Sequence, residues 1–591
     1  MIYKVTVQNR DYTSWKVEPV SQSTNDLTID VDISPIKSKL LSNDEFTLDN
    51  NNNVTITHSP LRLGGAFPAV LILEGNKTYG QSSKDKDKKN SQRFLYKCIP
   101  DDTALPAFLV PYEMKKVAFS KAFKNMYVTV TYDNWDDKHP VAKLDNVIGP
   151  VDCTEHFYEY QLFCNSINAS IQKFHRDTNK ALKGVTHDEI IDRILTNYEN
   201  IQDRTDWHVI SIDPEDSLDF DDAVSIRDIG DTKMLSIYIS NVSLYLDTLN
   251  LWDSFSKRVS TIYLPDRKRT MLPTVLSDCL CSLQEKERRV AFVVDLYINN
   301  DGTITDIKYN NCVIKVAKNH RYEERSLLAN KGYIDILNTV RQLSAKYPYV
   351  ESIRDSHDVV CYLMVLTNYF CAKELLQSKT GLFRSVIKND IKNDTNDTNE
   401  TNETTKIPDS VPRDILYTLK MMTSATSGKY VDASVTDVSG VRHDLLQLDA
   451  YVHITSPIRR LPDLLNMIKF QQVHGLTNLS VTSHNFYNKW IQDLDYINVS
   501  MKRIRKVQNE STLLHMCNKN SDLMERQHDG YLFNKKCREN GMFQYCVFLP
   551  ELKLTSYITS QDHYENYECK KIKLFLFNDE EKFKKKIRLH I

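Results

Sequence analysis

The stretch that decides the fold and the chemistry of this chain is SIDPEDSLDFDDA, residues 211–223, which holds six carboxylates in thirteen positions. The β-like runs HVISID and DAVSI lie at its two ends, so the pattern predicts a strand, an acidic loop and a second strand. An EF-hand calcium loop starting at Asp213 would need Gly and Glu where Leu218 and Val224 stand. A calcium loop of that kind is therefore excluded.

Two interpretations of the acidic run remain. One is a solvated surface loop. The other starts from the repulsion among carboxylates that lie beside apolar residues, which divalent cations would offset. Oxygen ligands at this density suit Mg²⁺, or Mn²⁺ as the alternative, and a pair of such ions is a recurring device for in-line attack on a phosphodiester. The candidate metal ligands are Asp213, Asp219, Asp221 and Asp222, whereas Glu215 and Asp216 are expected to be ordinary loop residues.

A second stretch, YVHITSPIRRLPDL at residues 451–464, would supply the positive charge that such a site lacks. Its Thr-Ser pair is a suitable N-cap, with Pro457 at the first helical position and an apolar periodic run after it. Arg459 and Arg460 would then fall in the first turn, where the helix dipole already favours anions, and this placement predicts a phosphate clamp. The alternative is a surface ion pair between Arg459 and Asp463.

The composition bounds the class of protein. A chain of 591 residues implies roughly three to five domains. Its net charge of −2 argues neither for nor against a nucleic-acid partner. The chain starts without a secretory leader and has no uninterrupted apolar run of about 18 residues, so we expect a soluble, cytoplasmic protein with no membrane segment. The twelve cysteines lack paired zinc-site spacing and are interpreted as reduced core residues.

The chain is organised as barrels, a mixed α/β centre and a last barrel. Short β-like runs fill residues 1–165 and return from residue 540, which favours small antiparallel barrels. The tract NDTNDTNETNETT, residues 393–405, is too polar to bury itself and predicts a disordered insertion. Four aromatics in the N-terminal runs are either core residues or base-stacking positions: Tyr79, Phe94, Tyr96 and Trp135.

Three segments resemble the ribonuclease II, ribonuclease R and exosome catalytic-subunit family, and they follow one another along the chain in the order that the family has. Segment 211–223 resembles its Asp-Pro…Asp-x-Asp-Asp-Ala stretch, and segment 450–464 its Tyr-x-His-x-Thr-Ser-Pro-Ile-Arg-Arg segment. Between them, STIYLPDRKRTMLPTVLSDCLCSL, residues 260–283, is similar to its Tyr-Leu-Pro…Met-Leu-Pro…Leu-Cys-Ser-Leu block. The run at 93–112 looks like part of the family's second cold-shock barrel. The short barrels and the Asn/Lys-rich insertion resemble copies carried by large DNA viruses.

The resemblance implies a multidomain α+β protein with cold-shock-like OB barrels, an RNB catalytic domain and a C-terminal OB-like barrel. The activity it implies is processive, hydrolytic 3′ to 5′ degradation of single-stranded RNA to nucleoside 5′-monophosphates by a two-metal-ion mechanism. The domains it implies are a reduced first cold-shock-like region (1–64), a second cold-shock-like barrel (65–165), the RNB domain (166–535, with the insertion at 389–407) and the last barrel (536–591).

The resemblance also assigns expected roles to particular residues. Arg459 would bind the scissile phosphate, Tyr263 would stack on the 3′-terminal bases, and Tyr322 matches a pocket tyrosine. Glu525 matches an acidic residue of some bacterial members. The implied catalytic residues are Asp221, Asp222, Arg459, Tyr322 and Glu525. The implied RNA-binding residues are Tyr263, Arg459, Arg460, His453 and Ser456.

Two alternatives from other classes stay open. One is an RNB-fold RNA-binding module with weak or no catalysis, and the other is a subunit of an RNA-decay assembly. The aspartates argue against a pure binding module, because clustered negative charge repels phosphates. Single-stranded RNA is the expected partner, and the chain is expected to be a monomer.

Overall fold

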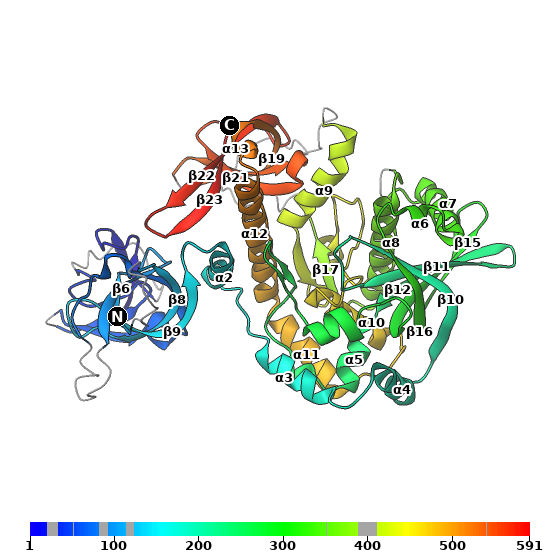
Figure 1. The fold of residues 1–591 in the computed structure, drawn as a ribbon, viewed down its shortest axis with the longest axis horizontal. Coiled ribbons are helices and arrows are strands. Elements are labelled where there is room, and N and C mark those ends of the chain that lie inside the picture. The colour runs from blue at the N-terminus through cyan, green and yellow to red at the C-terminus, as the bar shows by residue number, and fades with distance from the viewer. Residues whose placement is uncertain are drawn as a thin grey trace. The chain divides into compact units, whose positions relative to one another are not determined.

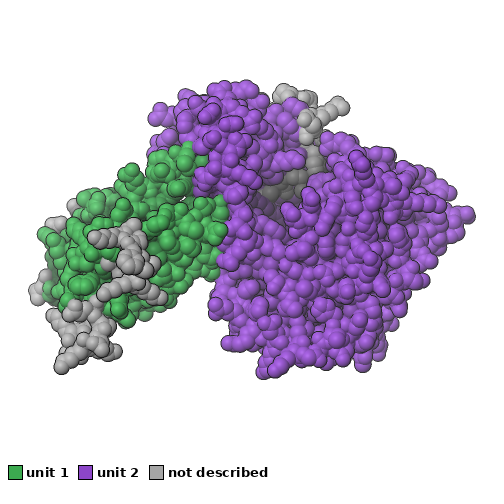
Figure 2. Space-filling view, viewed as in Figure 1, with its two compact units in different colours: residues 1–168, 576–587 green, residues 169–575, 588–591 purple. Residues whose placement is uncertain are grey.

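The computed structural model describes residues 1–20, 33–50, 52–81, 93–113, 123–349, 352–387, 411–538 and 540–591, so the predicted insertion at 389–407 lies outside the described residues. The chain divides into two compact units. Unit 1 comprises residues 1–168 and 576–587, and unit 2 comprises residues 169–575 and 588–591 (Figure 2). The predicted fold class, β-barrels combined with a mixed α/β centre, is confirmed, whereas the predicted domain boundaries stay predictions.

Unit 1 contains a four-stranded antiparallel sheet, ordered β2-β1-β3-β4, and a closed five-stranded barrel, ordered β5-β6-β7-β9-β8. One apolar core joins them, because Val5 and Phe46 of the sheet pack in the same cluster as Leu71 and Val110 of the barrel. The strands of the sheet are β1 (Ile2–Val7), β2 (Trp15–Pro19), β3 (Glu45–Leu48) and β4 (Val54–His58). The short α1 (Pro60–Leu63) leads to β5 (Phe67–Leu71), β6 (Phe94–Pro100), β7 (Phe108–Tyr112), β8 (Met126–Asn134), β9 (Val141–Pro150) and then α2 (Thr154–Cys164).

The centre of unit 2 is a second closed barrel, ordered β10-β11-β12-β15-β16 (Figure 1). Its strands are β10 (Ile201–Asp213), β11 (Asp222–Ile229), β12 (Thr232–Ser240), β15 (Arg288–Asn299) and β16 (Ile304–Arg321). Runs such as VAFVVDLYI in β15 are rich in β-branched residues and almost wholly buried, as expected for strands covered on both faces. The barrel closes where β10 runs parallel to β16, and register shifts between Arg204 and Ile210 bend β10 at this closure.

Helices cover this barrel and complete its core. The core cluster combines Ile212 of β10 and Ile237 of β12 with Ile336 of α7, Leu363 of α8 and Met467 of α10. Among the described residues, only α8 (Ser356–Gln377) is long and apolar enough to cross a membrane, and 56% of its apolar window is buried inside the protein, which fits a core helix. The other helices are α3 (Gln172–Ala181), α4 (His187–Asn197), α5 (Val242–Thr248), α6 (Arg325–Leu328), α7 (Lys331–Lys346), α9 (Arg413–Ser427), α10 (Leu461–Val473), α11 (Val481–Gln492), α12 (Leu494–Lys519) and α13 (Asp522–Glu525).

Two small two-stranded sheets and a C-terminal sheet complete the described fold. One is the hairpin of β13 (Ile262–Tyr263) and β14 (Lys268–Arg269), and the other pairs β17 (Leu382–Ser385) with the distant β18 (Lys429–Asp432). The five-stranded sheet is ordered β21-β20-β19-β22-β23. Its strands are β19 (Gln527–Cys537), β20 (Phe543–Leu549), β21 (Leu554–Ser560), β22 (Cys569–Asp579) and β23 (Lys584–His590).

Candidate active site

The four predicted aspartates gather at one rim of the unit 2 barrel. Asp213 is the last residue of β10 and Asp222 the first of β11, so the connecting loop carries Asp219 and Asp221 between them. Two backbone bonds fix this rim: Tyr322 N donates to Asp213 O (3.1 Å), and Ser240 N donates to Asp221 O (2.8 Å). Glu215 and Asp216 of the same loop are exposed, as expected of ordinary loop residues.

The segment at 260–283 anchors the acidic loop. Ser282 Oγ accepts a hydrogen bond from Phe220 N (3.0 Å) and donates one to Leu218 O (2.8 Å), and Leu283 N donates to Phe220 O (3.0 Å). Phe220 is buried in the core cluster that includes Leu283. The Cys-Ser-Leu end of this motif therefore fixes the conformation of the loop that presents Asp219 and Asp221.

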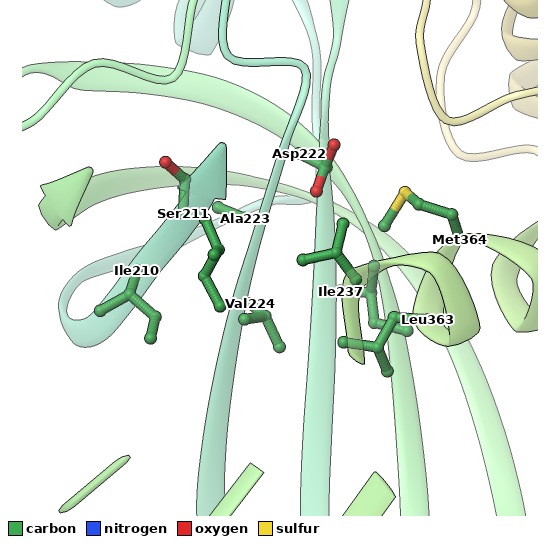
Figure 3. A pocket seen from close by; sticks show the side chains of 10 residues that line it. Ile210, Ser211, Asp222, Ala223, Val224, Ile237, Leu363 and Met364 are labelled. Atoms are coloured by element: carbon green, nitrogen blue, oxygen red, sulfur yellow. The ribbon is translucent and has the colours of Figure 1, made fainter. Parts of the chain in front are cut away.

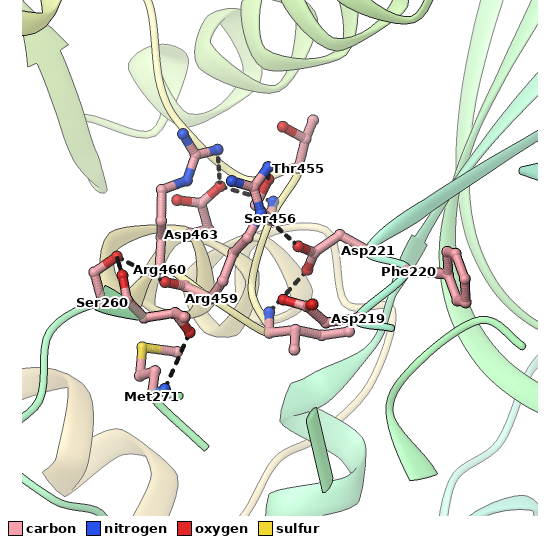
Figure 4. Close-up of polar contacts among 12 residues, drawn as sticks. Asp219, Phe220, Asp221, Ser260, Met271, Thr455, Ser456, Arg459, Arg460 and Asp463 are labelled. Atoms are coloured by element: carbon pink, nitrogen blue, oxygen red, sulfur yellow. Dashed lines mark hydrogen bonds and ion pairs between the residues drawn. The ribbon is translucent and has the colours of Figure 1, made fainter. Parts of the chain in front are cut away.

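Arg459 lies directly against the aspartates. Asp221 Oδ1 accepts from Ile458 N (2.9 Å), and Asp221 Oδ2 accepts from Arg459 Nε (3.0 Å) (Figure 4). A further donor atom of the guanidinium, Nη2, is bonded to Ser456 Oγ (3.0 Å). The Arg459 side chain keeps 42% of its surface exposed, so it has room to meet a ligand while it is held by Asp221. The alternative ion pair between Arg459 and Asp463 is not the one that forms.

The predicted start of the arginine-bearing helix is wrong. The helix α10 begins at Leu461, and Arg460 is its N-cap with an extended backbone, so neither arginine lies in the first turn. The reason is pairing with a distant segment: Thr261 N donates to Arg459 O (2.9 Å), and Leu461 N donates to Val259 O (2.9 Å). This pairing keeps Arg460 extended, and Arg459 lies in the turn before it, where the Ser456-Pro457 sequence alone had suggested a helix.

Arg460 and Ser456 are tied to a buried carboxylate instead. Asp463 Oδ1 accepts from Ser456 N (2.8 Å) and from Arg460 Nη2 (2.8 Å), as Figure 4 shows. Asp463 is completely buried in the first turn of α10. These bonds fix the turn that precedes Arg459. Ser456 and Arg460 therefore hold the arginine segment, residues 456–460, in its conformation.

Asp219 is bonded to a hairpin that faces the acidic loop. Its Oδ2 accepts from Tyr263 Oη (3.2 Å), and its Oδ1 accepts from Lys268 Nζ (2.9 Å). Lys268 also binds Asp278 Oδ1 (3.0 Å). The sequence reasoning missed Lys268 and Asp278, although both lie within segment 260–283. The signal that could have found them is the short hairpin around Leu-Pro-Asp-Arg, which puts Tyr263 directly opposite Lys268.

Burial raises the pKa of three of the aspartates. For Asp221 burial raises the pKa to about 7, against the lowering effects of the Arg459 charge and the Ile458 amide. For Asp213 and Asp222 burial again dominates, and the charges of neighbouring aspartates raise their pKa values further. Asp222 lines a cavity of only about 10 Å³ together with aliphatic side chains such as Ile237 and Leu363 (Figure 3). The cavity is too small for a nucleotide, and its aliphatic lining gives Asp222 apolar surroundings.

The aspartates fit a divalent cation. Within the described part of the chain, Asp213 Oδ2 is a buried oxygen with no hydrogen-bond donor, and Asp213 and Asp222 form no ion pair with a lysine or arginine. Two carboxylates with raised pKa values and no ion pair need either protons or a metal ion. An all-oxygen donor set of this kind suits Mg²⁺ or Mn²⁺.

Tyr322 lies beside the aspartates, as expected, whereas His453 has a supporting place. Tyr322 follows β16 directly, and the charges of Asp222 and Asp213 add to burial in raising its pKa, so its hydroxyl keeps its proton beside the aspartates. His453 is held by Tyr430, whose Oη lies 2.8 Å from His453 Nδ1, and burial followed by the charge of Arg460 lowers the pKa of His453. His453 is therefore a neutral residue that supports the arginine segment.

Glu525 and two of the four N-terminal aromatics are exposed, and the other two aromatics are buried. Glu525 is exposed at the end of α13, and in the described residues no hydrogen bond or ion pair joins it to the aspartates, so its role stays a prediction. Tyr96 and Trp135 are core residues of unit 1. Tyr79 and Phe94 are each 37% exposed and remain available for stacking.

A basic groove of about 410 Å³ lies between α12 and the C-terminal sheet within unit 2. Its lining residues include four cations, Lys502, Arg505, Lys506 and Lys536, and one carboxylate, Glu510. Burial, followed by the charge of Arg384, lowers the pKa of Arg505 to about 10, and Arg460 contributes in the same direction. Arg505 stays charged at neutral pH and lies within electrostatic range of the arginine segment. A groove of this charge suits a polyanion.

Comparisons with known proteins agree with this arrangement. The RNB domain model matches residues 201–333 and 330–474. Ribonuclease R of Mycoplasmopsis pulmonis is 25% identical over 356 residues, 51% of this chain and 48% of that protein. A probable exosome complex exonuclease RRP44 of Caenorhabditis elegans is 24% identical over 439 residues, 64% of this chain and 44% of that protein. The chain thus spans about half the length of the curated relatives it matches.

Solved structures show the same fold. Mycoplasma genitalium RNase R in complex with double-stranded RNA superimposes with a TM-score of 0.61 at 17% identity, over 92% of this chain and 98% of that chain. Yeast Ssd1, a pseudonuclease, superimposes with a TM-score of 0.55 at 15% identity, over 86% of this chain and 66% of that chain.

The barrel with its acidic rim, the arginine segment and the matched residues define an RNB domain at 201–474. The chain is therefore an RNB-domain protein that is similar to ribonuclease R and to the exosome exonuclease RRP44.

Proposed function

We propose that the protein is a processive hydrolytic exoribonuclease that degrades single-stranded RNA from its 3′ end to nucleoside 5′-monophosphates. The observation that carries the proposal is the juxtaposition of the aspartates with Arg459, which lies 3.0 Å from Asp221. A cluster of carboxylates attracts cations, and a half-exposed guanidinium beside it attracts an anion. A phosphodiester bound with a divalent cation satisfies both demands.

Mg²⁺, or Mn²⁺ in its place, would be held by the aspartates, with Asp213 and Asp222 as the ligands that have no cation from the chain. When bound, such a cation supplies Lewis-acid activation of water and neutralises charge on the phosphate. Sequence motifs assign Asp219 and Asp221 to the same centre and imply two ions. The contacts of Asp219 with Lys268 and Tyr263 affect how many metal ions the centre can hold.

Arg459 would bind the scissile phosphate and stabilise the charge that develops on it during attack. Asp221 and Ser456 hold the guanidinium in place, which reduces the reorganisation needed at the moment of reaction. Tyr322 would line the same site with a protonated hydroxyl.

The RNA strand would be held by stacking and by backbone contacts that read no sequence. Tyr263 is 41% exposed beside Asp219, so its ring can stack on a base near the 3′ end. The basic groove along α12 would neutralise phosphates farther upstream. Both features favour a flexible single strand over a duplex.

The alternative class is an RNA-binding module without turnover. The likeness to yeast Ssd1, a pseudonuclease, favours keeping it as the second candidate. The four aspartates and Arg459 argue for catalysis, because a binder gains nothing from negative charge that faces phosphates. We further infer a monomer that works in the cytoplasm, alone or within an RNA-decay assembly.

The test uses a 5′-labelled linear RNA and a circular RNA of the same sequence, each incubated with the purified protein and Mg²⁺. We expect the linear RNA to shorten from its 3′ end, the circular RNA to persist, and chelation to stop the reaction. Cleavage of the circle would exclude an exonuclease. RNA binding with no turnover in either Mg²⁺ or Mn²⁺ would support the binding module.

A further inference from the structure

The hairpin of β13 and β14 brings two donors to a single carboxylate. Tyr263 and Lys268 are directly opposed in its register. Tyr263 Oη donates to Asp219 Oδ2 (3.2 Å), and Lys268 Nζ donates to Asp219 Oδ1 (2.9 Å). Both oxygens of Asp219 are therefore engaged by the same hairpin. Each oxygen keeps a second lone pair, but a metal ion at Asp219 would lie beside the Lys268 ammonium group and be repelled by it.

The lysine is held from its other side as well. Lys268 Nζ binds Asp278 Oδ1 (3.0 Å), and Ser277 Oγ donates to the same oxygen (2.7 Å). The Lys268 side chain is only 23% exposed, and the side chains of Asp219 and Asp278 are 9% and 16% exposed. Burial lowers the pKa of Lys268, while the bonds to Asp219 and Asp278 raise it, and the net direction is upward. The ammonium group is thus a permanent charge between two nearly buried carboxylates.

The remaining aspartates are not equivalent to Asp219. Arg459 already neutralises Asp221, at 3.0 Å. Asp213 and Asp222 have no ion pair among the described residues, and Asp213 Oδ2 is buried without a donor. Of the four aspartates, only this last pair forms no ion pair among the described residues, although, against the raising effect of burial, Arg459 lowers the pKa of both and Arg321 lowers that of Asp213. Asp213 and Asp222 are therefore the carboxylates most open to an added divalent cation.

We propose that Lys268 takes the place of a second metal ion on Asp219, so that the centre binds a single divalent cation between Asp213 and Asp222. This inference deepens the proposed function and rests on it for the purpose of the site. Lys268 is a charge-balancing residue that also positions Asp219 and, through it, Tyr263. A lysine ammonium is a compact point charge, which suits it to this replacement.

The experiment counts metal ions without any turnover. Mn²⁺ is titrated into metal-free protein, bound ions are counted from the loss of the free-ion electron paramagnetic resonance signal, and the count is repeated with an RNA whose last linkage is a phosphorothioate. We expect one tightly bound Mn²⁺ in the wild type, with and without RNA. We expect two in Lys268→Met, because Asp219 then becomes available, and one in Lys268→Arg, which keeps the charge.

Two further variants make the result specific. Adding Asp219→Asn to Lys268→Met should return the count to one, since the second ion needs that carboxylate. Lys286→Met removes an exposed lysine that pairs only with Glu285 among the described contacts, and it should leave the count at one. Circular dichroism confirms that each variant is folded.

Two tight ions in the wild type, or an unchanged count in Lys268→Met, would overturn the proposal. Loss of the single ion in Asp219→Asn alone would do the same. Because the count needs no hydrolysis, its outcome is separate from that of the exonuclease assay. If the wild-type protein hydrolyses RNA and binds two ions, the proposed function stands and only the role of Lys268 is wrong.

Discussion

Two pairs of aspartates lie within ten positions of the same barrel rim, and they differ in what balances their charge. Asp219 and Asp221 each meet a cation of the chain, at 2.9 Å and 3.0 Å. Asp213 and Asp222 form no ion pair among the described residues, where the ion pairs of the acidic loop are those of Asp219 and Asp221. Residue type and spacing alone therefore do not assign a role to a carboxylate. A carboxylate balanced by the chain positions its neighbours, whereas an unbalanced one recruits a ligand.

Of all the variants, Asp222→Asn should have the largest effect on metal binding and on the rate of hydrolysis. It removes half of the unbalanced pair at nearly constant volume, so both Mn²⁺ binding and RNA hydrolysis should fail. Loss of a catalytic cation is worth about 3–5 kcal/mol, or roughly 10²–10⁴-fold in rate. The measurements are Mn²⁺ calorimetry and single-turnover hydrolysis of a 3′-terminal nucleotide.

Asp216→Asn is the matched control, because Asp216 lies in the same loop and is exposed. It should leave both readouts unchanged. Mn²⁺ bound by Asp222→Asn with wild-type affinity would show that the ligand pair has been assigned to the wrong residues.

Substitution of Arg459 tests the balanced pair, Asp219 and Asp221, whose charges are met by cations of the chain. Arg459→Ala should lower the rate by about 10²–10³-fold, the usual effect of removing one group that stabilises a developing negative charge. It should also lower the melting temperature, because Asp221 is 2% exposed and would lose its ion pair. Adding Asp221→Asn should recover the melting temperature without recovering the rate. A double variant that regains activity would mean that Arg459 acts only by neutralising Asp221.

Asp221, Asp213 and Asp222 should also make the stability of the metal-free protein depend on pH. Burial raises the folded-state pKa of Asp221 to about 7 and raises those of Asp213 and Asp222, against about 4 in an unfolded chain. The folded state thus binds more protons between these values. Its stability is full below about pH 4 and falls as pH rises through 7, by about 1–4 kcal/mol.

Thermal unfolding in chelator at pH 5.5 and pH 8 measures this dependence. The melting temperature should be lower at pH 8, Mg²⁺ should raise it at pH 8 more than at pH 5.5, and Asp222→Asn should shrink the gap between the two pH values. A gap of the same size in Asp222→Asn would place the titrating groups elsewhere.

The sequence predicted the parts of the site whose signals are local. The acidic loop between two strands was read from residue type and alternation. The number and order of short strands predicted barrels. In both cases the sequence signal lies within a few residues of chain, in the alternation of each strand and in the acidity of one loop.

The parts that failed depend on contacts between distant segments. Residues 455–457 carry a sound helix-cap pattern, yet pairing with residues 259–261 keeps Arg460 extended and delays the start of α10 to Leu461. Closure of the unit 2 barrel needs the parallel pairing of β10 with β16, for which the sequence holds no marker. Lys268 stands in a hairpin whose strands have two residues each, too short for any periodicity.

The smallest predicted effect separates two roles of Tyr263 on the balanced side of the comparison. Tyr263→Phe keeps the ring and removes only the hydroxyl bond to Asp219, whereas Tyr263→Ala removes the ring as well. Stacking is worth about 1–3 kcal/mol per base, so Tyr263→Ala should weaken RNA binding by roughly 5–150-fold, while Tyr263→Phe should stay close to the wild type. Because the side chain is 41% exposed, neither variant should lower the melting temperature much. Fluorescence anisotropy with a 3′-labelled RNA in chelator measures the affinity. Equal losses in both variants would mean that Tyr263 acts by fixing Asp219 and not by stacking, which would join it to Lys268 as a residue that only positions the carboxylate.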